Sequence, residues 1–335
     1  MGVSQAQTPN IIRAAYESGI RYFDTGYSYQ NGRSEEMIGQ VLGDKPRDSF
    51  LVGTKSRYRY PLTNGFEEQL EREFSTSLQR LKVDYVDIFF AHDCKSVEAV
   101  TDPRVIAAMT KIKESGRAKL IGFSSHDQKP EIFQAGIDAG IYDVMIVSYN
   151  FKLDNLKETE AVIERAAQAG IGIFTMKSLC GGVANATTGE KIDAASCLKW
   201  IWQNPHITTS LPGFSNYDEL EECLSAGHAP ELQPSEEQYL SSLMANETLY
   251  CQHCDACAGQ CPQNLPIPDI MRAYMYTYGY HRPQMSKAVL ADLGVPANAC
   301  VECDSCTVQC RSGFDVGAKI AAIRPVVEVP DAFLA

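Results

Sequence analysis

The chain has 335 residues, of which 44% are hydrophobic and 21% charged, so it can form one large and one small globular domain. Its formal net charge of −12 disfavours nucleic acid, which selects basic surfaces. No apolar run approaches the roughly 20 residues that span a bilayer, and no signal peptide is visible in residues 1–10. We therefore expect a cytoplasmic protein that does not bind membranes.

From Thr8 to about Gly227 the chain repeats a short apolar run, a polar turn and an amphipathic helix. The apolar runs are Ile20–Phe23, Phe50–Gly53, Tyr85–Phe90, Lys119–Phe123, Val144–Val147, Ile171–Thr175 and Thr208–Leu211. The predicted helices are Pro9–Ser18, Ser34–Leu42, Phe66–Leu81, Pro103–Ser115, Lys129–Ala139, Lys157–Ala169, Ala194–Gln203 and Tyr217–Ala226. This alternation indicates parallel β/α units. Because no G-x-G-x-x-G follows a strand, a β/α barrel is favoured over a doubly wound sheet.

Around Ala229–Ser235, prolines and acidic residues indicate a linker between two domains. The barrel is expected to cover residues 1–229, and a second, small and mainly helical domain residues 235–325. Helices are predicted there at about Glu236–Asn246 and Pro268–Tyr278. The tail, residues 326–335, is expected to dock along the surface.

Eight of the twelve cysteines fall in two runs of identical spacing, C-x-x-C-x-x-C-x-x-x-C. The runs are Cys251, Cys254, Cys257, Cys261 and Cys300, Cys303, Cys306, Cys310. This spacing is typical of bacterial-type 4Fe–4S clusters. A disulfide scaffold is typical of small secreted modules, and zinc prefers two separated C-x-x-C pairs, so both are disfavoured alternatives. The other cysteines, Cys94, Cys180, Cys197 and Cys223, are expected to be buried free thiols, which fits a reducing compartment.

Polar residues follow the first three apolar runs, where a β/α barrel carries its chemistry. These residues are Asp24, Lys55 and His92, and Tyr29 lies five residues after Asp24. Together they make sense as an acid–base group: Asp24 orients Lys55, and Lys55 lowers the pKa of Tyr29. His92 would then polarise a carbonyl oxygen.

The segment Asp24–Tyr29, with Gly32-Arg33-Ser34-Glu35, Lys55 and His92, resembles the aldo–keto reductase superfamily. Further similarities are Tyr149-Asn150, Met176-Lys177 with Gly181-Gly182, and Leu211–Asn216. With the cysteine runs, the chain is similar to a subgroup that carries a C-terminal ferredoxin-type domain. The resemblance implies a (β/α)8-type TIM barrel, and NAD(P)H-linked carbonyl reduction or alcohol oxidation with Tyr29 as general acid or base.

The resemblance also implies two kinds of cofactor. One 4Fe–4S cluster would bind Cys251, Cys254, Cys257 and Cys310, and the other Cys300, Cys303, Cys306 and Cys261. The implied nicotinamide contacts are Ser124, Ser125, Asn150, Lys177, Gly213, Phe214, Ser215 and Asn216. The last four precede a helix, whose free N–H groups would face phosphate. No Lys or Arg occurs in residues 213–222, so NAD and NADP both stay open.

The family begins with a strand and a glycine-containing loop, whereas this chain starts almost at the first helix. We therefore count seven strands instead of eight. Two unpaired sheet edges are costly, so we expect either a truncated start or another segment that covers the gap.

The leading hypothesis is an oxidoreductase that acts on a small carbonyl or alcohol and exchanges electrons with a partner protein through its clusters. A nicotinamide moves two electrons as hydride and a cluster moves one, so direct exchange between them is awkward. One alternative is a lyase that forms a Schiff base on Lys55 or Lys177. The other is an iron–sulfur electron carrier or sensor on a degenerate barrel.

Overall fold

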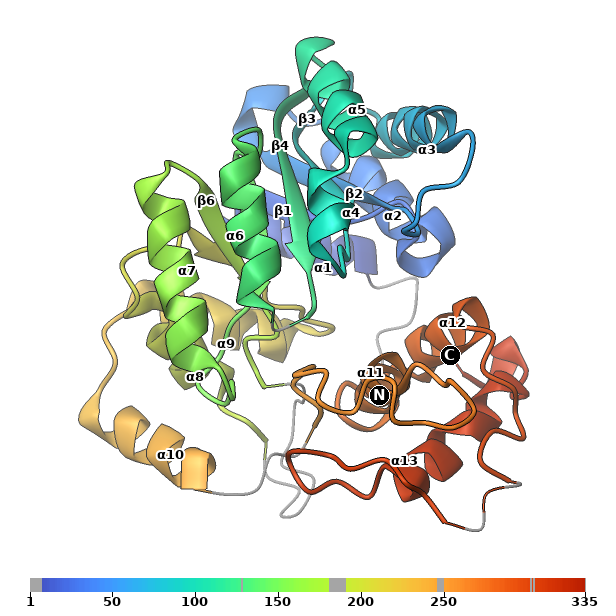
Figure 1. Ribbon diagram of the computed structural model, residues 1–335. Helices are drawn as coiled ribbons and strands as arrows, with labels where there is room; N and C mark the ends of the chain where they lie inside the picture. Colours follow the sequence, from blue (N-terminus) through green and yellow to red (C-terminus); the bar gives the residue numbers. More distant parts are fainter. Residues whose placement is uncertain are drawn as a thin grey trace.

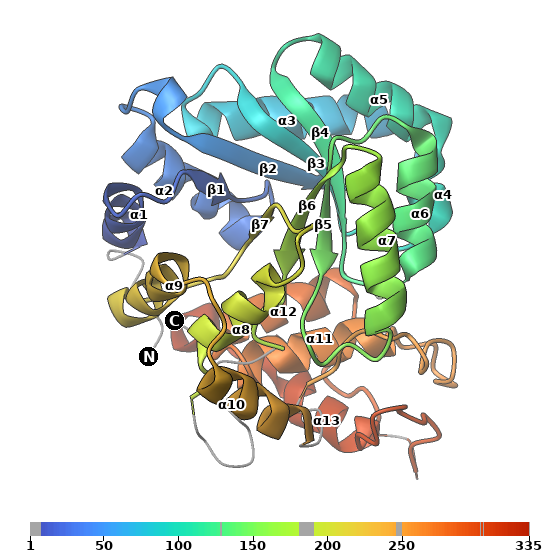
Figure 2. The same cartoon turned by 90° about the vertical axis from the view of Figure 1, so that its left-hand side faces the viewer.

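The computed structural model describes residues 8–127, 129–180, 191–245, 250–301, 303 and 305–334. Its strands are β1 (Tyr22–Asp24), β2 (Leu51–Arg57), β3 (Val86–His92), β4 (Ala118–Ser125), β5 (Val144–Ser148), β6 (Gly172–Met176) and β7 (Thr209–Ser210). They form one parallel sheet in chain order, curled like an open barrel (Figure 2). Within the described ranges β1 and β7 are its two edges and do not pair with each other. The seven-stranded barrel wall predicted from the sequence is confirmed.

Helices cover the outer side of this sheet (Figure 1). They are α1 (Thr8–Glu17), α2 (Arg33–Leu42), α3 (Phe66–Leu81), α4 (Val97–Thr101), α5 (Pro103–Glu114), α6 (Pro130–Ala139), α7 (Leu156–Gln168), α8 (Ala194–Trp202) and α9 (Tyr217–His228). Local sequence sets their ends. Asp102 caps α5 by accepting a hydrogen bond from the Arg104 N–H, with Pro103 at the first helical position. Gly140 ends α6 at φ 67°, a left-handed conformation that glycine adopts easily.

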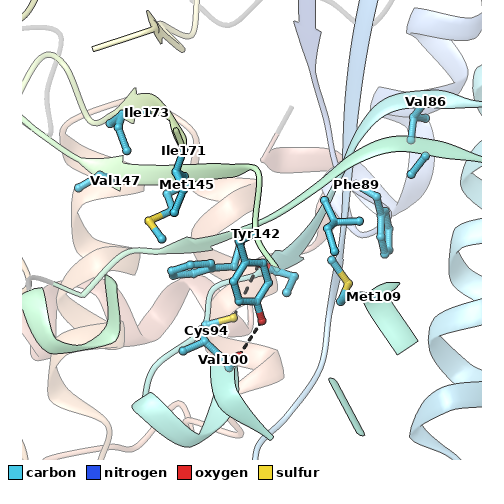
Figure 3. Packing of buried hydrophobic residues seen from close by; sticks show 14 of the residues in the cluster. Val86, Phe89, Cys94, Val100, Met109, Tyr142, Met145, Val147, Ile171 and Ile173 are labelled. Atoms are coloured by element: carbon cyan, nitrogen blue, oxygen red, sulfur yellow. Dashed lines mark hydrogen bonds between the residues drawn. The ribbon is translucent and has the colours of Figure 1, made fainter. Parts of the chain in front are cut away.

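Two apolar layers lie on the two faces of the strands, because successive side chains point to opposite sides. Phe89 packs outward with Phe74 and Met109 against the helices, whereas Phe90 packs inward with Phe174. In the outer layer, the Tyr142 hydroxyl finds a partner in the Val100 carbonyl oxygen at 2.7 Å (Figure 3). Each large apolar side chain buried here contributes about 1.5–3 kcal/mol. The layers hold the strand ends in fixed positions.

Two glycines offer a test of this packing. A Cβ on Gly39, in α2, would lie 2.2 Å from the Arg80 carbonyl oxygen at the end of α3, so the two helices would have to separate. We expect Gly39→Ala to lower the free energy of unfolding by about 1–3 kcal/mol. Gly227→Ala in α9 is the control, because a Cβ there meets nothing within 4 Å. Denaturant unfolding with equal midpoints for both variants would contradict the close helix contact.

The C-terminal part of the chain contributes α10 (Pro234–Ala245), α11 (Ile267–Tyr278), α12 (Pro283–Asp292) and α13 (Val316–Ile323). Helices α11 to α13 enclose a small core of their own, in which Ile270, Leu290 and Ile320 are buried. Helix α10 instead packs on the barrel: Leu240 joins an apolar cluster with Cys197 of α8. A domain boundary at residue 235 therefore places α10 in the second domain, although this helix packs on the barrel.

The tail lies on α12, as expected. Lys287 donates to the Val329 carbonyl oxygen at 2.8 Å and pairs with Asp331 at 2.7 Å. Cys94 and Cys197 are buried, while Cys180 and Cys223 are half-buried, and all four are free thiols. In the described residues no helix has the length and apolarity required for a membrane span.

The C-terminal helices sit across the carboxyl ends of the strands (Figures 1 and 2). Ion pairs join the two parts: Lys95 to Asp269 at 2.5 Å, and Arg57 and Arg59 to Asp292 at 3.1 Å and 2.7 Å. The barrel mouth is therefore closed by protein from the second half of the chain.

Candidate active site and cluster sites

The carboxyl ends of the first three strands bring together the four residues predicted as an acid–base group. Lys55 forms a salt bridge with Asp24 at the end of β1 and donates to the Thr25 carbonyl oxygen at 2.8 Å. The Tyr29 hydroxyl lies 3.5 Å from Nε2 of His92, which ends β3. The Lys55 ammonium is 5.3 Å from the centre of the Tyr29 ring. The four side chains therefore share one site.

Burial controls ionisation in this group. It raises the pKa of Tyr29 well above its ordinary value, and the Asp24 carboxylate adds to the rise. It lowers the pKa of Lys55, although the pull of Asp24 opposes this shift. It lowers the pKa of His92 to about 3. At neutral pH the site thus holds a phenol, a neutral imidazole and a lysine–carboxylate salt bridge.

The expected lowering of the Tyr29 pKa is wrong: its net shift is upward. The ammonium is neutralised by the adjacent Asp24, so burial of the phenol determines the shift. A tyrosine with a raised pKa keeps its proton near neutral pH, which makes its hydroxyl a hydrogen-bond donor and a source of a proton.

Helix α11 covers the tyrosine side of the site. Its Arg272 donates to Asp93, the residue after β3, at 3.2 Å and to Asp269 at 2.8 Å. The side chains of Arg272 and Asp93 are 4% and 3% exposed, so this ion pair is internal. Tyr276, one turn further along α11, contributes to the raised pKa of Tyr29. Side chains from both parts of the chain therefore line the site.

Two of the residues assigned to the nicotinamide by resemblance end β4 and are buried. Ser124 Oγ accepts a hydrogen bond from the Asp93 N–H at 3.0 Å. Ser125 Oγ accepts one from the Asp127 N–H at 3.2 Å. Both hydroxyls thus organise the loops that follow the strands at the barrel mouth.

Two further assigned residues follow β5 and β6. Asn150 Nδ2 donates to the Lys177 carbonyl oxygen at 3.1 Å and to Oε1 of Gln252, from the C-terminal part, at 3.3 Å. Burial, and after it the nearby Arg272, lowers the pKa of Lys177 to about 8. The C-terminal segment therefore already contacts one of the side chains expected to hold the nicotinamide.

The loop Gly213–Asn216 precedes α9, as predicted. Its backbone donors are not all free for phosphate: the Ser215 N–H donates to Glu219 at 2.6 Å, and Asn216 accepts from the Glu219 N–H at 2.8 Å. Arg282, at the start of α12, donates to the Ser215 hydroxyl. The positive group near this loop thus comes from the second domain, outside residues 213–222.

The cysteines gather in the two sets that the resemblance implies. A hollow that is partly open to solvent is lined by the first set, Cys251, Cys254, Cys257 and Cys310. In the second set, burial and the neighbouring thiols of Cys303, Cys261 and Cys306 raise the pKa of Cys300. Each set combines three close cysteines of one run with the fourth cysteine of the other.

N–H groups also point at the sulfurs. The His253 N–H lies 3.4 Å from Sγ of Cys251, and Nε2 of Gln263 lies 3.3 Å from Sγ of Cys303. Hydrogen bonds to sulfur are a normal feature of iron–sulfur sites and influence their potentials. In the described residues no three His, Cys, Asp or Glu side chains converge as ligands of one ion. Four thiolates around a hollow fit a 4Fe–4S cube, which each thiolate would bind at a separate iron.

Replacement of a single cysteine tests whether the two sets of cysteines bind iron independently. We expect Cys254→Ala to lower bound iron from about eight to about four atoms per chain, because only the first set loses a thiolate. Iron analysis and the electron paramagnetic resonance of the reduced protein measure this. The control is Cys223→Ala, a half-buried thiol outside both runs. Unchanged iron content in Cys254→Ala would contradict the assignment.

Sequence reasoning missed four residues at the barrel mouth. Asp93 and His126 directly follow β3 and β4, so the rule that found His92 would also have found them. His253 and Arg272 arrive from the second domain, and no sequence signal places them on the barrel. His253 lies between two cluster cysteines, with its Nδ1 3.7 Å from Asp127.

Comparison with known proteins is consistent with this fold. A model of the aldo/keto reductase family matches residues 2–196, and a model of a 4Fe-4S dicluster domain matches residues 250–315. The first match covers more than half of the chain, which therefore belongs to the aldo/keto reductase family. It is an oxidoreductase of this family with an added 4Fe–4S dicluster domain.

Curated relatives span a range of reactions. The chain is 26% identical over 268 residues to L-galactose dehydrogenase of Arabidopsis thaliana, covering 70% of this chain and 82% of the relative. It is 29% identical over 208 residues to the NADH-specific methylglyoxal reductase of Escherichia coli, covering 57% of this chain. Only 62% of the length of that reductase is spanned.

Solved structures share the fold. An aldo-keto reductase from Bacillus halodurans in its holo form superposes with a TM-score of 0.59 at 20% identity, covering 76% of this chain and 92% of that one. An aldo-keto reductase from Klebsiella pneumoniae in complex with NADPH gives a TM-score of 0.56 at 20% identity, covering 72% and 85%.

Proposed function

We propose that the protein is an NAD(P)H-linked carbonyl reductase in which Tyr29 is the general acid and the reverse reaction oxidises an alcohol. One observation carries this proposal. Tyr29 and His92 meet at the barrel mouth within 3.5 Å, directly beside the salt bridge of Lys55 with Asp24. A carbonyl oxygen placed between the phenol and the imidazole would meet two donors.

Each side chain has a distinct role in this proposal. Tyr29 keeps its proton because its pKa is raised, and gives it to the carbonyl oxygen as negative charge develops there. His92 is neutral, so it orients the oxygen as a hydrogen-bond donor and adds no charge. Lys55 stabilises the phenolate that remains, and Asp24 holds Lys55 in place. The nicotinamide, when bound, supplies the hydride.

The nicotinamide would lie against Ser124, Ser125, Asn150, Lys177 and the loop Gly213–Asn216. Ser124 fits such a group beside His92, because its hydroxyl accepts from the N–H of Asp93, the residue after His92. At Asn150 and Ser215, side chains of the C-terminal part are already in contact. The cofactor would therefore share those positions with Gln252 and Arg282.

In this proposal the clusters would exchange single electrons with an electron-transfer protein in a step separate from hydride transfer, which delivers both nicotinamide electrons to the carbonyl carbon. Cys306, in the second set, is exposed, and Val301 beside that set is 58% exposed. The first set instead lies next to the barrel mouth through the Cys251–Cys254 loop. A partner would meet the second set, and the first would face the substrate side.

An anaerobic titration of the whole iron-loaded protein with NADH and with NADPH tests this proposal. Nicotinamide and cluster absorbance are followed together, with and without a panel of aldehydes. The expected result is aldehyde-dependent oxidation of one nucleotide. Clusters that a chemical reductant reduces, in a protein that neither binds nor oxidises NADH or NADPH, would support the electron carrier and overturn the reductase.

A second candidate rests on Lys177. Its pKa is lowered to about 8 and its Nζ has no hydrogen-bond partner in the described residues, as a Schiff-base lysine requires. Lys55 is held by Asp24 and is the weaker choice. Borohydride trapping of a carbonyl substrate on Lys177, found by peptide mapping, would favour the lyase.

A further inference from the structure

Beside the acid–base group of Asp24, Tyr29, Lys55 and His92 lies a second group of polar side chains, of which the proposed function uses only Lys177. In the residues that the structure describes, buried nitrogen atoms without a hydrogen-bond partner gather at the joint between the barrel and the C-terminal part. They are Nζ of Lys177, Nδ1 of His126, Nε of Arg272 and both ring nitrogens of His253. Nearly all of these atoms can donate, so the group is suited to an acceptor with negative charge.

Contacts link three of these side chains to the acid–base group and to the strand ends beside it. The His126 ring lies 6.2 Å from the His92 ring, whose other neighbour is Tyr29 at 5.5 Å. Arg272 and His253 are each placed beside an aspartate in the first two residues after a barrel strand. Arg272 lies 3.2 Å from Asp93, and Nδ1 of His253 lies 3.7 Å from Asp127.

These groups are sealed from solvent. His253 is 1% exposed and Arg272 3%, and Nζ of Lys177 is buried although part of its stem is not. Arg272 is already neutralised by Asp93 and Asp269, whereas Lys177 makes no ion pair in the described residues. An unpaired buried ammonium is unfavourable, and a bound anion removes that penalty.

The backbone of Lys177 adopts a strained conformation. Its φ of 58° is left-handed, a region that a residue with a Cβ seldom adopts. Asn150 holds it there by donating to the Lys177 carbonyl oxygen at 3.1 Å. Such strain persists where the surroundings fix a functional side chain in one direction.

We propose that Lys177, Arg272, His126 and His253 bind the carboxylate of the substrate, which makes a short 2-oxo acid the preferred carbonyl compound. This inference rests on the proposed carbonyl reduction. The keto oxygen lies between Tyr29 and His92, and the adjacent carboxylate reaches the nitrogen atoms beside His126. Hydride adds to the keto carbon and Tyr29 protonates its oxygen, so the product is a 2-hydroxy acid.

Binding is tested without any reaction. Oxamate, an unreactive analogue of a 2-oxo acid, is titrated calorimetrically into the whole iron-loaded protein. Loss of charge-assisted hydrogen bonds in Lys177→Met is expected to weaken its binding about 10- to 100-fold, and Lys177→Arg is expected to restore part of it. Lys111→Met, at an exposed site on α5, is the matched control. Equal binding of oxamate and inorganic phosphate, or equal binding in Lys177→Met, would overturn the carboxylate site.

Kinetics then separate this inference from the proposed function. The ratio of kcat/KM for pyruvate to kcat/KM for its uncharged methyl ester is measured in the wild type and in Lys177→Met. A ratio that falls about 10- to 100-fold supports the site. If the wild type reduces the ester and the acid equally well, the carboxylate site is overturned, whereas the proposed carbonyl reduction is not. Oxamate binding that depends on Lys177, without reduction of any carbonyl, would instead overturn the reductase alone. If the Lys177→Met variant lacks the absorbance of the iron–sulfur clusters, the same measurements are made on the Lys177→Gln variant.

Discussion

Tyr29→Phe is expected to lower kcat/KM for carbonyl reduction about 100- to 10,000-fold, because it removes the group that protonates the developing alkoxide. Folding should be unaffected, since in the described residues the tyrosine hydroxyl has one hydrogen-bond partner, His92 at 3.5 Å. The measurement is NAD(P)H oxidation with saturating and limiting aldehyde, together with the iron content of both proteins.

Tyr27→Phe is the control for this variant. Tyr27 lies two residues away, and its ring packs against the Arg80 guanidinium at 4.7 Å, a contact that phenylalanine keeps. Its turnover should equal that of the wild type. Equal turnover in Tyr29→Phe would remove the tyrosine from the mechanism, whatever the clusters do.

Arg272→Met is expected to lower the free energy of unfolding by about 3 kcal/mol, because it takes a cation from two buried carboxylates. Arg57 still reaches Asp93 and Lys95 still reaches Asp269, so the effect lies at the lower end for a broken buried pair. Arg59→Met is the matched control. Arg59 is 75% exposed, and loss of its pair with Asp292 should cost less than about 1 kcal/mol.

The Arg272 effect should depend on pH. Burial alone would raise the pKa of Asp93, but Arg272, followed by His126 and Lys95, holds it well below its ordinary value. A carboxyl with a depressed folded pKa stabilises the protein above its unfolded pKa of about 3.9. That stabilisation is lost as the pH falls toward the folded pKa. The difference between wild type and Arg272→Met should therefore narrow below about pH 4. A difference that stays constant from pH 7 to pH 3 would exclude an ionic cause.

The fold could be predicted from sequence because its signals are local. Each strand is a short apolar run, α3 begins after Gly65, and α6 begins at Pro130 and ends at Gly140. Helices α12 and α13 were missed because their pattern is weak: α13 reads VGAKIAAI and is apolar on most of its surface. Helix α4, at five residues, is too short for a periodic signal.

The candidate site was predictable only in part, for a geometric reason. Side chains at strand ends converge in any parallel barrel, so Asp24, Lys55 and His92 could be grouped from sequence. Arg272 contacts Asp93, from which it is separated by 179 positions in the sequence, and no pattern in either segment predicts this contact. The pKa of Tyr29 failed as a prediction because burial depends on the covering helix, which sequence did not place.

The loop between Cys251 and Cys254 carries Gln252 and His253 into the barrel mouth, where they meet Asn150 and Asp127. Gln252 and His253 lie between two cysteines that a bound cluster would fix, so the positions of both residues depend on that cluster. Exposure to air attacks iron–sulfur sites first and would here deform the substrate chamber as well. Bleaching of colour and loss of catalysis should then proceed with the same half-life.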